Sequence, residues 1–465
     1  MSISSLGLLK SHLLTSLIIY IAIVSALPLL GKFQLKSAEA PNRSFGDLEQ
    51  MVRQKHYIEF ARDLDHSRGL SLSESVFLSG ILANRKNRVM ESIRLLEPLV
   101  QTLVHGPIEY AELGLCTLAD DCAKRFRYGD AADTYIMLAN IPGYTEESSA
   151  CHAVSEADRW SLLRRAPPQK TTVSSAFTVK EIHTSAGLLE VNVRAPHFSD
   201  HWILDTGANL SAVTRSVAER LGLTLTTATS TAQGSGGVFV RIHTAVIPEL
   251  HIGRATIRNL AVLVFEDADL SFPELSHQIH GSLGFPALQS LGIITFHDDG
   301  RFTVHDAVSP GKGRSTELYL EGFTILLEAA IAGRDHFFTL DTGASGTYLS
   351  REYYQEHRNT SDTMPLRDLE LIGTGGSRII HTYVLDDINI KLGGANAELH
   401  DLDVLTEPTG LPAEFAGNLG QSTLGVLSDY TIDFRNMTFI VHVRSNAASN
   451  KPPTKSAKVG QICCT

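Results

Sequence analysis

Two copies of one short stretch constrain this sequence more than any other feature. Each copy is an apolar run that ends in aspartate and continues as Thr-Gly-Ala, at residues 202–208 and again at residues 338–344. The apolar run predicts a buried strand, and the glycine allows a sharp turn with close backbone approach. An acid at the end of a buried strand is costly to ionise unless it is paired, hydrogen-bonded or shares a proton. Asp205 and Asp341 are therefore predicted to meet in one shared site.

The duplication extends beyond this stretch. Each acid is followed by a glycine-rich hairpin tip, and later by a Gly-X-Leu-Gly segment that precedes another apolar strand. The distance from the acid to the final glycine of that segment is 79 positions in both copies, 284 minus 205 and 420 minus 341. Matched landmarks in the same order indicate an internal duplication of a β unit. The tips are Gly234, Ser235, Gly236 and Gly237 in the first copy, and Gly373, Thr374, Gly375 and Gly376 in the second.

The paired Asp-Thr-Gly-Ala stretches, the glycine-rich tips and the later Leu-Gly segments resemble the retropepsin-like aspartic proteases, over about residues 176–444. The resemblance implies two loops that face each other across a pseudo-two-fold axis. Retroviral members form this arrangement by dimerising, whereas a chain that carries both units needs no second copy. It also implies hydrolysis of a peptide or protein substrate by water, with no metal and no other cofactor.

The resemblance assigns roles to individual residues. Asp205 and Asp341 would be the catalytic acids. Both glycine-rich tips would be flaps that close over an extended peptide. The supporting residues would be Thr206, Gly207, Thr342 and Gly343. Two features depart from the family pattern: pepsin-like enzymes have a single flap with a tyrosine, and retroviral enzymes have an apolar residue where Ser282 and Asn418 stand.

The remainder of the chain predicts a multidomain protein, with an all-α helical-hairpin region before an all-β bilobal aspartic protease fold. Residues 45–166 have helical periodicity, which fits a bundle, a repeat stack similar to tetratricopeptide repeats that binds a protein partner, or a removable pro-segment. The predicted boundaries are a linker at 167–175, a first lobe at 176–306, an inter-lobe linker at 307–316, a second lobe at 317–444 and a flexible tail at 445–465.

The N-terminal 40 residues contain an apolar run at 13–30, which predicts either a cleaved secretory signal or an uncleaved membrane anchor. A buried helix is the third interpretation. Either of the first two places the protein outside the cytoplasm, in the periplasm or secreted, with membrane contact only through this segment. The net charge of −11 argues against a nucleic-acid-binding protein.

The five cysteines are too few to define the fold. Cys116 and Cys122 point to different faces of a continuous helix, so a bridge from either one to Cys151 is the open possibility. His277 and His280 are interpreted as surface histidines, because no matching ligands flank them. The alternative function is a catalytically silent peptide-binding or envelope interaction protein that uses the helical region.

Overall fold

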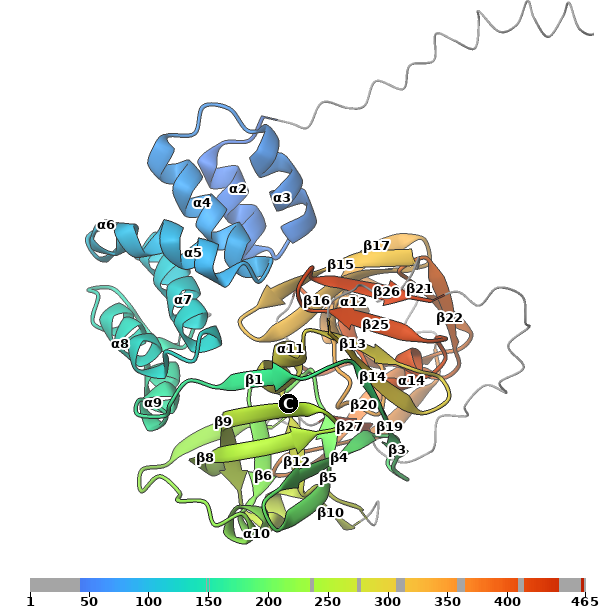
Figure 1. The fold of residues 1–465 in the computed structure, drawn as a ribbon. Coiled ribbons are helices and arrows are strands. Elements are labelled where there is room, and N and C mark those ends of the chain that lie inside the picture. The colour runs from blue at the N-terminus through green and yellow to red at the C-terminus, as the bar shows by residue number, and fades with distance from the viewer. Residues whose placement is uncertain are drawn as a thin grey trace, which may run out of the picture.

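The computed structural model describes residues 42–147, 149, 151–234, 238–273, 277–306, 314–357, 364–408, 414–442 and 461–463. The predicted N-terminal export segment lies outside these residues. Within them the chain forms helices first and then a large β-rich region (Figure 1). No helix in these ranges is both long and apolar enough to cross a membrane.

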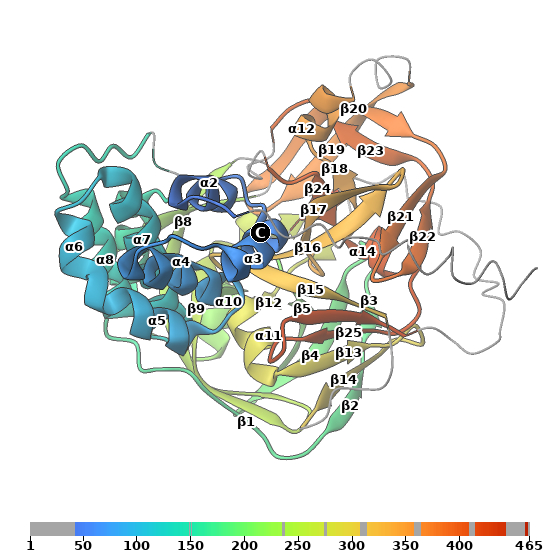
Figure 2. The same ribbon diagram turned by 90° about the horizontal axis from the view of Figure 1, so that it is seen from above.

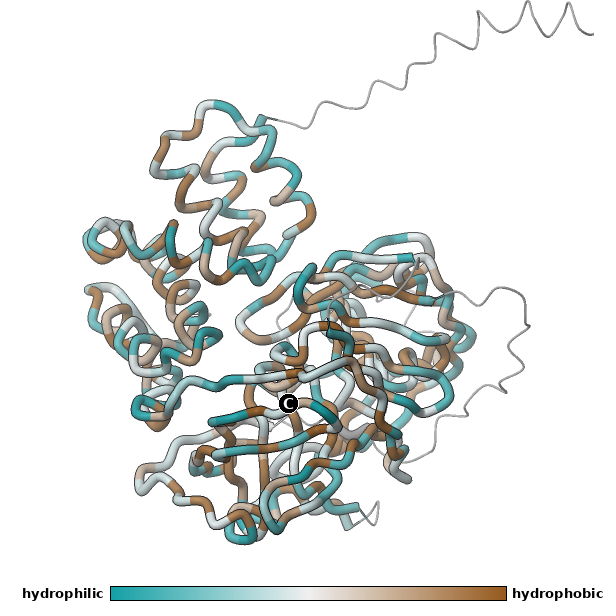
Figure 3. Tube along the Cα trace, viewed as in Figure 1, coloured by the Kyte–Doolittle hydropathy of each residue, from teal (hydrophilic) through white to brown (hydrophobic). Residues whose placement is uncertain are grey.

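The helices stack in sequence order, each packed against its neighbours. Apolar and polar residues alternate along them (Figure 3), and their buried apolar side chains belong to one core cluster. The helices are α2 (Phe45–Arg53), α3 (Tyr57–His66), α4 (Leu72–Arg85), α5 (Val89–Leu96), the short η1 (Glu97–Leu99), α6 (Val100–Val104), α7 (Ile108–Lys124), α8 (Tyr128–Ala139) and α9 (Ala153–Leu162).

Three of the helical hairpins share one turn geometry. Three residues separate α2 from α3, α4 from α5 and α7 from α8, and the middle one, Lys55, Asn87 or Phe126, has left-handed backbone. In each turn the next residue donates its backbone N–H to a carbonyl five positions earlier, as Arg88 does to Ala83 at 2.7 Å. This bond satisfies a carbonyl that the end of the helix leaves free. The same local solution therefore recurs, although the sequence around it varies.

A disulfide joins Cys116 of α7 to Cys151, just before α9, with a Cα–Cα distance of 6.2 Å. This settles which of the two candidate cysteines pairs with Cys151. Cys122 is buried and free.

The first half of the β region runs from residue 170 to residue 305. Its elements are β1 (Lys170–Val173), β2 (Phe177–Lys180), β3 (Ile182–His183), β4 (Leu189–Ala195), β5 (Phe198–Leu204), β6 (Ser211–Thr214), α10 (Arg215–Arg220), β7 (Ser230–Gln233), β8 (Phe239–Ile252), β9 (Ala255–Phe265), η2 (Asp267–Leu270), β10 (Ser271–Phe272), β11 (His277–Gln278), β12 (Gly281–Leu283), α11 (Phe285–Leu291), β13 (Ile293–Phe296) and β14 (Arg301–His305).

The second half repeats much of this order. Its elements are β15 (Arg314–Glu321), β16 (Thr324–Ile331), β17 (Arg334–Leu340), β18 (Tyr348–Leu349), α12 (Arg351–Glu356), β19 (Leu366–Gly373), β20 (Gly376–Leu385), β21 (Ile388–Leu392), β22 (Ala395–Leu399), β23 (Leu402–Leu405), β24 (Gly417–Leu419), α14 (Gln421–Leu424), β25 (Tyr430–Asp433), β26 (Thr438–Val441) and β27 (Gln461–Cys463).

The two halves are joined through one sheet. A nine-stranded sheet lies within the first half, while a sixteen-stranded sheet contains strands of both (Figure 2). Strand β13 of the first half pairs antiparallel with β25 of the second, and Thr295 lies opposite Thr431. Their hydroxyls form a 2.7 Å hydrogen bond. The halves therefore share a continuous hydrogen-bonded ladder.

Three predicted boundaries need correction. The predicted linker at 167–175 contains β1, which pairs antiparallel with β9 and so belongs to the first sheet. Strand β15 begins at Arg314, inside the predicted inter-lobe linker, because its first residues pair with β26. The segment at 445–465, predicted as a tail, contains β27, which pairs with β19. In all three places strand pairing orders a segment whose own sequence has no strong pattern.

The helices are docked onto the β15–β16 hairpin of the second half. Glu321, at the tip of this hairpin, forms ion pairs with Lys55 and Arg85. Its carboxylate oxygens lie 2.6 Å from Lys55 Nζ and 3.3 Å from Arg85 Nε. These two cations hold the pKa of Glu321 at about 2, although burial opposes its ionisation. Tyr57 stacks on Tyr319 beside them. The helical region is thus fixed against the β region by charge and by aromatic packing.

Candidate active site

Both predicted acids follow the end of a buried strand at an equivalent point. Asp205 follows β5, and its backbone N–H donates to the Leu283 carbonyl of β12 at 3.1 Å. Asp341 follows β17, and its N–H donates to the Leu419 carbonyl of β24 at 3.0 Å. In each half the second strand runs parallel to the first. The Leu-Gly segments therefore hold the ends of the acid-bearing strands.

The two Asp-Thr-Gly loops are tied together by four crossed hydrogen bonds. The Thr206 N–H donates to Thr342 Oγ1 at 3.1 Å, and the Thr342 N–H donates to Thr206 Oγ1 at 2.9 Å. Each hydroxyl then donates to the carbonyl before the opposite acid, Thr206 to Leu340 at 2.8 Å and Thr342 to Leu204 at 2.7 Å. Both threonines are fully buried. These bonds hold the two Asp-Thr-Gly loops side by side.

The glycines of the loops stand where no side chain fits. A Cβ atom on Gly207 would lie 2.6 Å from Cγ of Asp341, and one on Gly343 would lie 2.4 Å from Cγ of Asp205. Real Cβ atoms do not approach other heavy atoms this closely. Each glycine thus allows the carboxyl group of the other loop to reach the centre of the site.

The carboxyl groups are held by backbone donors and hidden from solvent. Asp205 Oδ1 accepts hydrogen bonds from the Gly207 and Ala208 N–H groups, both at 3.0 Å, and Asp341 Oδ1 accepts one from Gly343 at 2.8 Å. The exposed fractions of Asp205 and Asp341 are 0% and 2%. The second oxygen of Asp205 receives no hydrogen bond from the described backbone or from any described side chain other than Asp341.

Burial raises the pKa of both acids, and it is the largest cause for each. The negative charge of Asp341 raises the pKa of Asp205 further, to well above its ordinary value. For Asp341, the backbone donors and the side-chain amide of Asn418 offset part of the rise. The charge on Asp341 therefore opposes ionisation of Asp205 in this buried setting.

The two halves differ directly behind the acids. In the second half Thr339 of β17 lies opposite Asn418 of β24, and its hydroxyl donates to Asn418 Oδ1 at 2.5 Å. In the first half the same register positions are Ile203 and Ser282. Asn418 is 3% exposed, and its Nδ2 makes no other hydrogen bond to the described residues. In the sequence, Asn418 stands out only as a departure from the family pattern. Thr339, a polar residue between Phe338 and Leu340 at the buried end of β17, is the signal that could have indicated its role.

The predicted flaps meet each other above the acids. Gly373 and Gly376 close the β19–β20 hairpin as a pair, with Thr374 and Gly375 in the turn. A Cβ on Gly234, beside the β7–β8 tip, would lie 2.0 Å from the Thr374 carbonyl oxygen, so the two hairpins touch there. The Gly375 N–H donates to the Asp269 carbonyl at 2.8 Å. Residues 235–237, also predicted in the first flap, lie outside the described residues.

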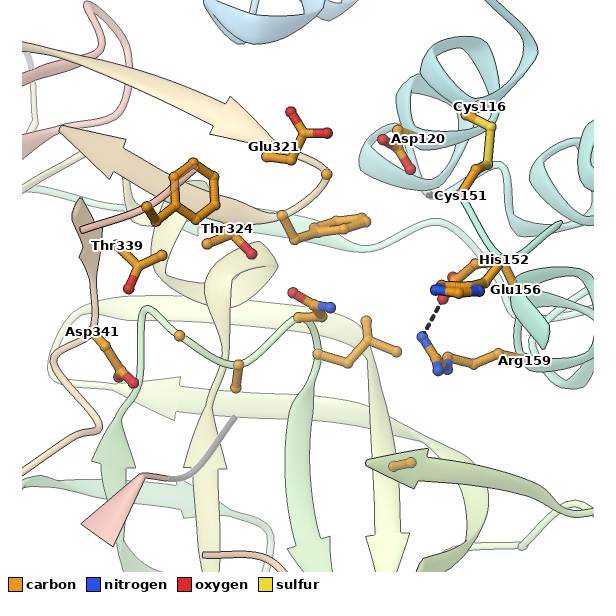
Figure 4. A pocket seen from close by; sticks show the side chains of 18 of the residues that line it. Cys116, Asp120, Cys151, His152, Glu156, Arg159, Glu321, Thr324, Thr339 and Asp341 are labelled. Carbon is orange, nitrogen blue, oxygen red and sulfur yellow. Dashed lines mark hydrogen bonds and ion pairs between the residues drawn. A yellow bond between two sulfur atoms is a disulfide. The ribbon is translucent and has the colours of Figure 1, made fainter. Parts of the chain in front are cut away.

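A cavity of about 670 Å³ runs from Asp341 to the helical region. Gly207, Ala208, Asn418 and Asp341 line one end, together with Gly234 and Thr374 of the flaps. Figure 4 shows the opposite end, where His152, Glu156 and Arg159 of the α9 segment and Asp120 of α7 face the same space. Helix α9 also packs beside β7. The helical region therefore forms one wall of the site.

His277 and His280 do not come together as a ligand pair. His280 forms an ion pair with Asp200 at 3.1 Å, and its side chain is exposed. His277 is largely buried near Glu190, 3.8 Å away, which corrects its interpretation as a surface histidine. Burial lowers the pKa of His277.

Comparison with known proteins supports a protease. Residues 197–287 match the sequence model of a family described as aspartyl protease. The matched segment contains Asp205, the β7–β8 hairpin and the Leu283-Gly284 segment. No curated protein matches the chain. The chain thus carries a segment similar to aspartyl proteases, a class of hydrolase that acts on peptides or proteins.

Proposed function

We propose that this chain is a single-chain aspartic endopeptidase whose two β units are related by a pseudo-two-fold axis. The crossed threonine bonds carry the proposal, because they join equivalent residues of the two loops in both directions. The bonded partners Thr206 and Thr342 are 136 positions apart, and so are Thr295 and Thr431. A pseudo-two-fold axis that passes between the two threonines of each pair explains why both pairs have the same sequence separation. No second copy of the chain is required.

The proposed reaction uses both acids on one water molecule. The ionised acid removes a proton from water as the water oxygen bonds to the scissile carbonyl carbon. The protonated acid donates to the carbonyl oxygen, which forms a tetrahedral diol. When the C–N bond breaks, a proton passes to the departing amine, and the pair returns to its single shared proton. The backbone donors that hold each Oδ1 keep both carboxyl groups oriented throughout.

We assign the ionised role to Asp341 and the protonated role to Asp205. Asn418 breaks the symmetry: its Oδ1 is fixed by Thr339, which leaves the amide N–H₂ to stabilise a charge on Asp341. The matching positions beside Asp205 hold Ser282 and Ile203, and no side-chain amide. Asn418 is therefore a positioning residue for the base.

Asn418→Ser is expected to move the acidic limb of the kcat/KM profile to higher pH by about one unit. The Asn418 amide lowers the pKa of Asp341, and loss of such a polar interaction with a charged group costs roughly 1.5 kcal/mol, which corresponds to about one pKa unit. The sign follows from the role, because a base with a higher pKa loses its charge at a higher pH. Ser282→Ala, at the matching position of the first half, is the control and should leave this limb in place. Equal profiles for all three proteins would contradict the assignment.

The activity itself is tested on an unfolded protein and on a peptide library. We expect cleavage within the chains and inhibition by a statine-type peptide, whose hydroxyl mimics the tetrahedral diol. Binding of peptides without cleavage at any pH from 3 to 8 would favour the silent peptide-binding alternative. The helical region, which lines the far end of the cavity, would then be its recognition surface.

We further propose that the protein is exported. The apolar run at 13–30 is the sequence basis for this proposal. The Cys116–Cys151 disulfide supports it, since such bonds persist in oxidising compartments.

A further inference from the structure

The C-terminal strand β27 lies on the edge of the second flap. It pairs parallel with β19, with Gln461 opposite Leu371, Ile462 opposite Ile372 and Cys463 opposite Gly373. Strand β20 occupies the other side of β19, so β27 is the last strand of this sheet. Figure 1 shows the β27 and β19 labels side by side in the middle of the β region, although β27 belongs to the end of the chain.

This edge leads to the proposed site. Cys463 lies opposite Gly373, and the next residue of the flap, Thr374, lines the same cavity as Asp341. Thr374 also contacts Gly234 of the other flap through its carbonyl oxygen. The C-terminal strand therefore runs toward the flap tip and ends, within the described residues, one position before the cavity-lining Thr374 in the β19 register.

We propose that the outer edge of β19 is a binding edge for extended peptides, and that the chain's own C-terminal segment occupies it as an intramolecular competitor. This inference rests on the proposed function: the C-terminal segment would limit the access of substrate to the protease site. An edge strand presents unpaired N–H and C=O groups to any extended chain, whatever its sequence. A substrate that pairs with β19 needs the groups that β27 uses, so the two exclude each other.

The corresponding edge of the first flap is not covered by a described strand. Strand β7 ends the first sheet and pairs only with β8 among the described strands. Helix α9 packs beside β7, whereas β19 is covered by a strand that an extended peptide must displace. Because the competitor is tethered, its effective concentration is on the order of millimolar, and even weak pairing raises the apparent KM severalfold.

The test is a variant that ends at residue 445, which keeps β26 and removes β27. We expect its KM for a peptide substrate to fall about tenfold relative to the full chain, with kcat nearly unchanged. In the full chain, Ile462→Pro should reproduce most of this fall, because proline disrupts a paired strand. Ala447→Pro is the matched control outside β27 and should leave KM unchanged.

A binding measurement separates this inference from the proposed function. A fluorescent peptide of residues 454–465, with Cys463 and Cys464 replaced by serine, is titrated into the truncated chain carrying Asp205→Asn. We expect saturable binding that the full-length Asp205→Asn chain does not show. If the peptide binds but no variant hydrolyses a substrate, the proposed protease activity is wrong and the proposed binding edge on β19 is supported. If the peptide does not bind and KM is unchanged after truncation, the C-terminal segment does not compete with substrate for β19.

Discussion

Asp341→Asn is expected to lower kcat by about 10³–10⁴-fold and to leave the fold intact. The amide has the shape of the carboxyl group, and its oxygen still accepts the 2.8 Å hydrogen bond from the Gly343 N–H. It cannot take a proton from water, so the general-base contribution is lost. Asp205→Asn should cause a loss of similar size, because no proton is then available for the carbonyl oxygen. Steady-state cleavage of a fluorogenic peptide measures both losses.

The melting temperature of these variants distinguishes a loss of catalysis from a loss of folding. Each substitution removes a buried acid whose pKa is raised chiefly by burial, so the melting temperature should stay equal or rise. Asp299→Asn, in an exposed ion pair with Arg301, is the matched control and should keep full activity. Activity that survives in both dyad variants would exclude the proposed mechanism.

Gly343→Ala is expected to reduce kcat/KM by at least about 100-fold and to destabilise the protein by about 1–3 kcal/mol. The new methyl group would lie 2.4 Å from Cγ of Asp205, so the two loops must separate. Separation stretches the four threonine bonds and displaces both carboxyl groups. Urea unfolding followed by intrinsic fluorescence gives the free energy of unfolding, and peptide hydrolysis gives the rate.

Gly46→Ala controls for the general effect of adding a methyl group. Gly46 lies in α2, where nothing stands within 4 Å of a new Cβ. Alanine favours a helix more than glycine does, so stability should rise slightly and activity should not change. A Gly343→Ala protein with normal kcat/KM would show that the loops tolerate separation, which the crossed bonds argue against.

Local pattern was enough to predict the elements around the acids. The apolar runs before Asp205 and Asp341 form strands β5 and β17, and the helical periodicity before residue 166 forms helices. The helices could be predicted because their repeat spacing follows from backbone geometry alone. Strand β1 and the early start of β15 could not, since these residues are ordered by partners far along the chain, Arg258 and Val441 among them. The docking of the helices on Glu321 could not be predicted from the sequence for the same reason.

By itself, the sequence determined that two equivalent acids exist, each at the end of a buried strand and followed by a glycine that permits close approach. The duplication can be recognised from the amino-acid sequence alone. Only the tertiary structure decided how the halves differ: it placed Asn418 behind one acid, the helical wall on one end of the cavity and the C-terminal strand on one flap. Each of these depends on contacts between residues far apart in sequence, and the energy of such contacts is set by three-dimensional packing rather than by local pattern.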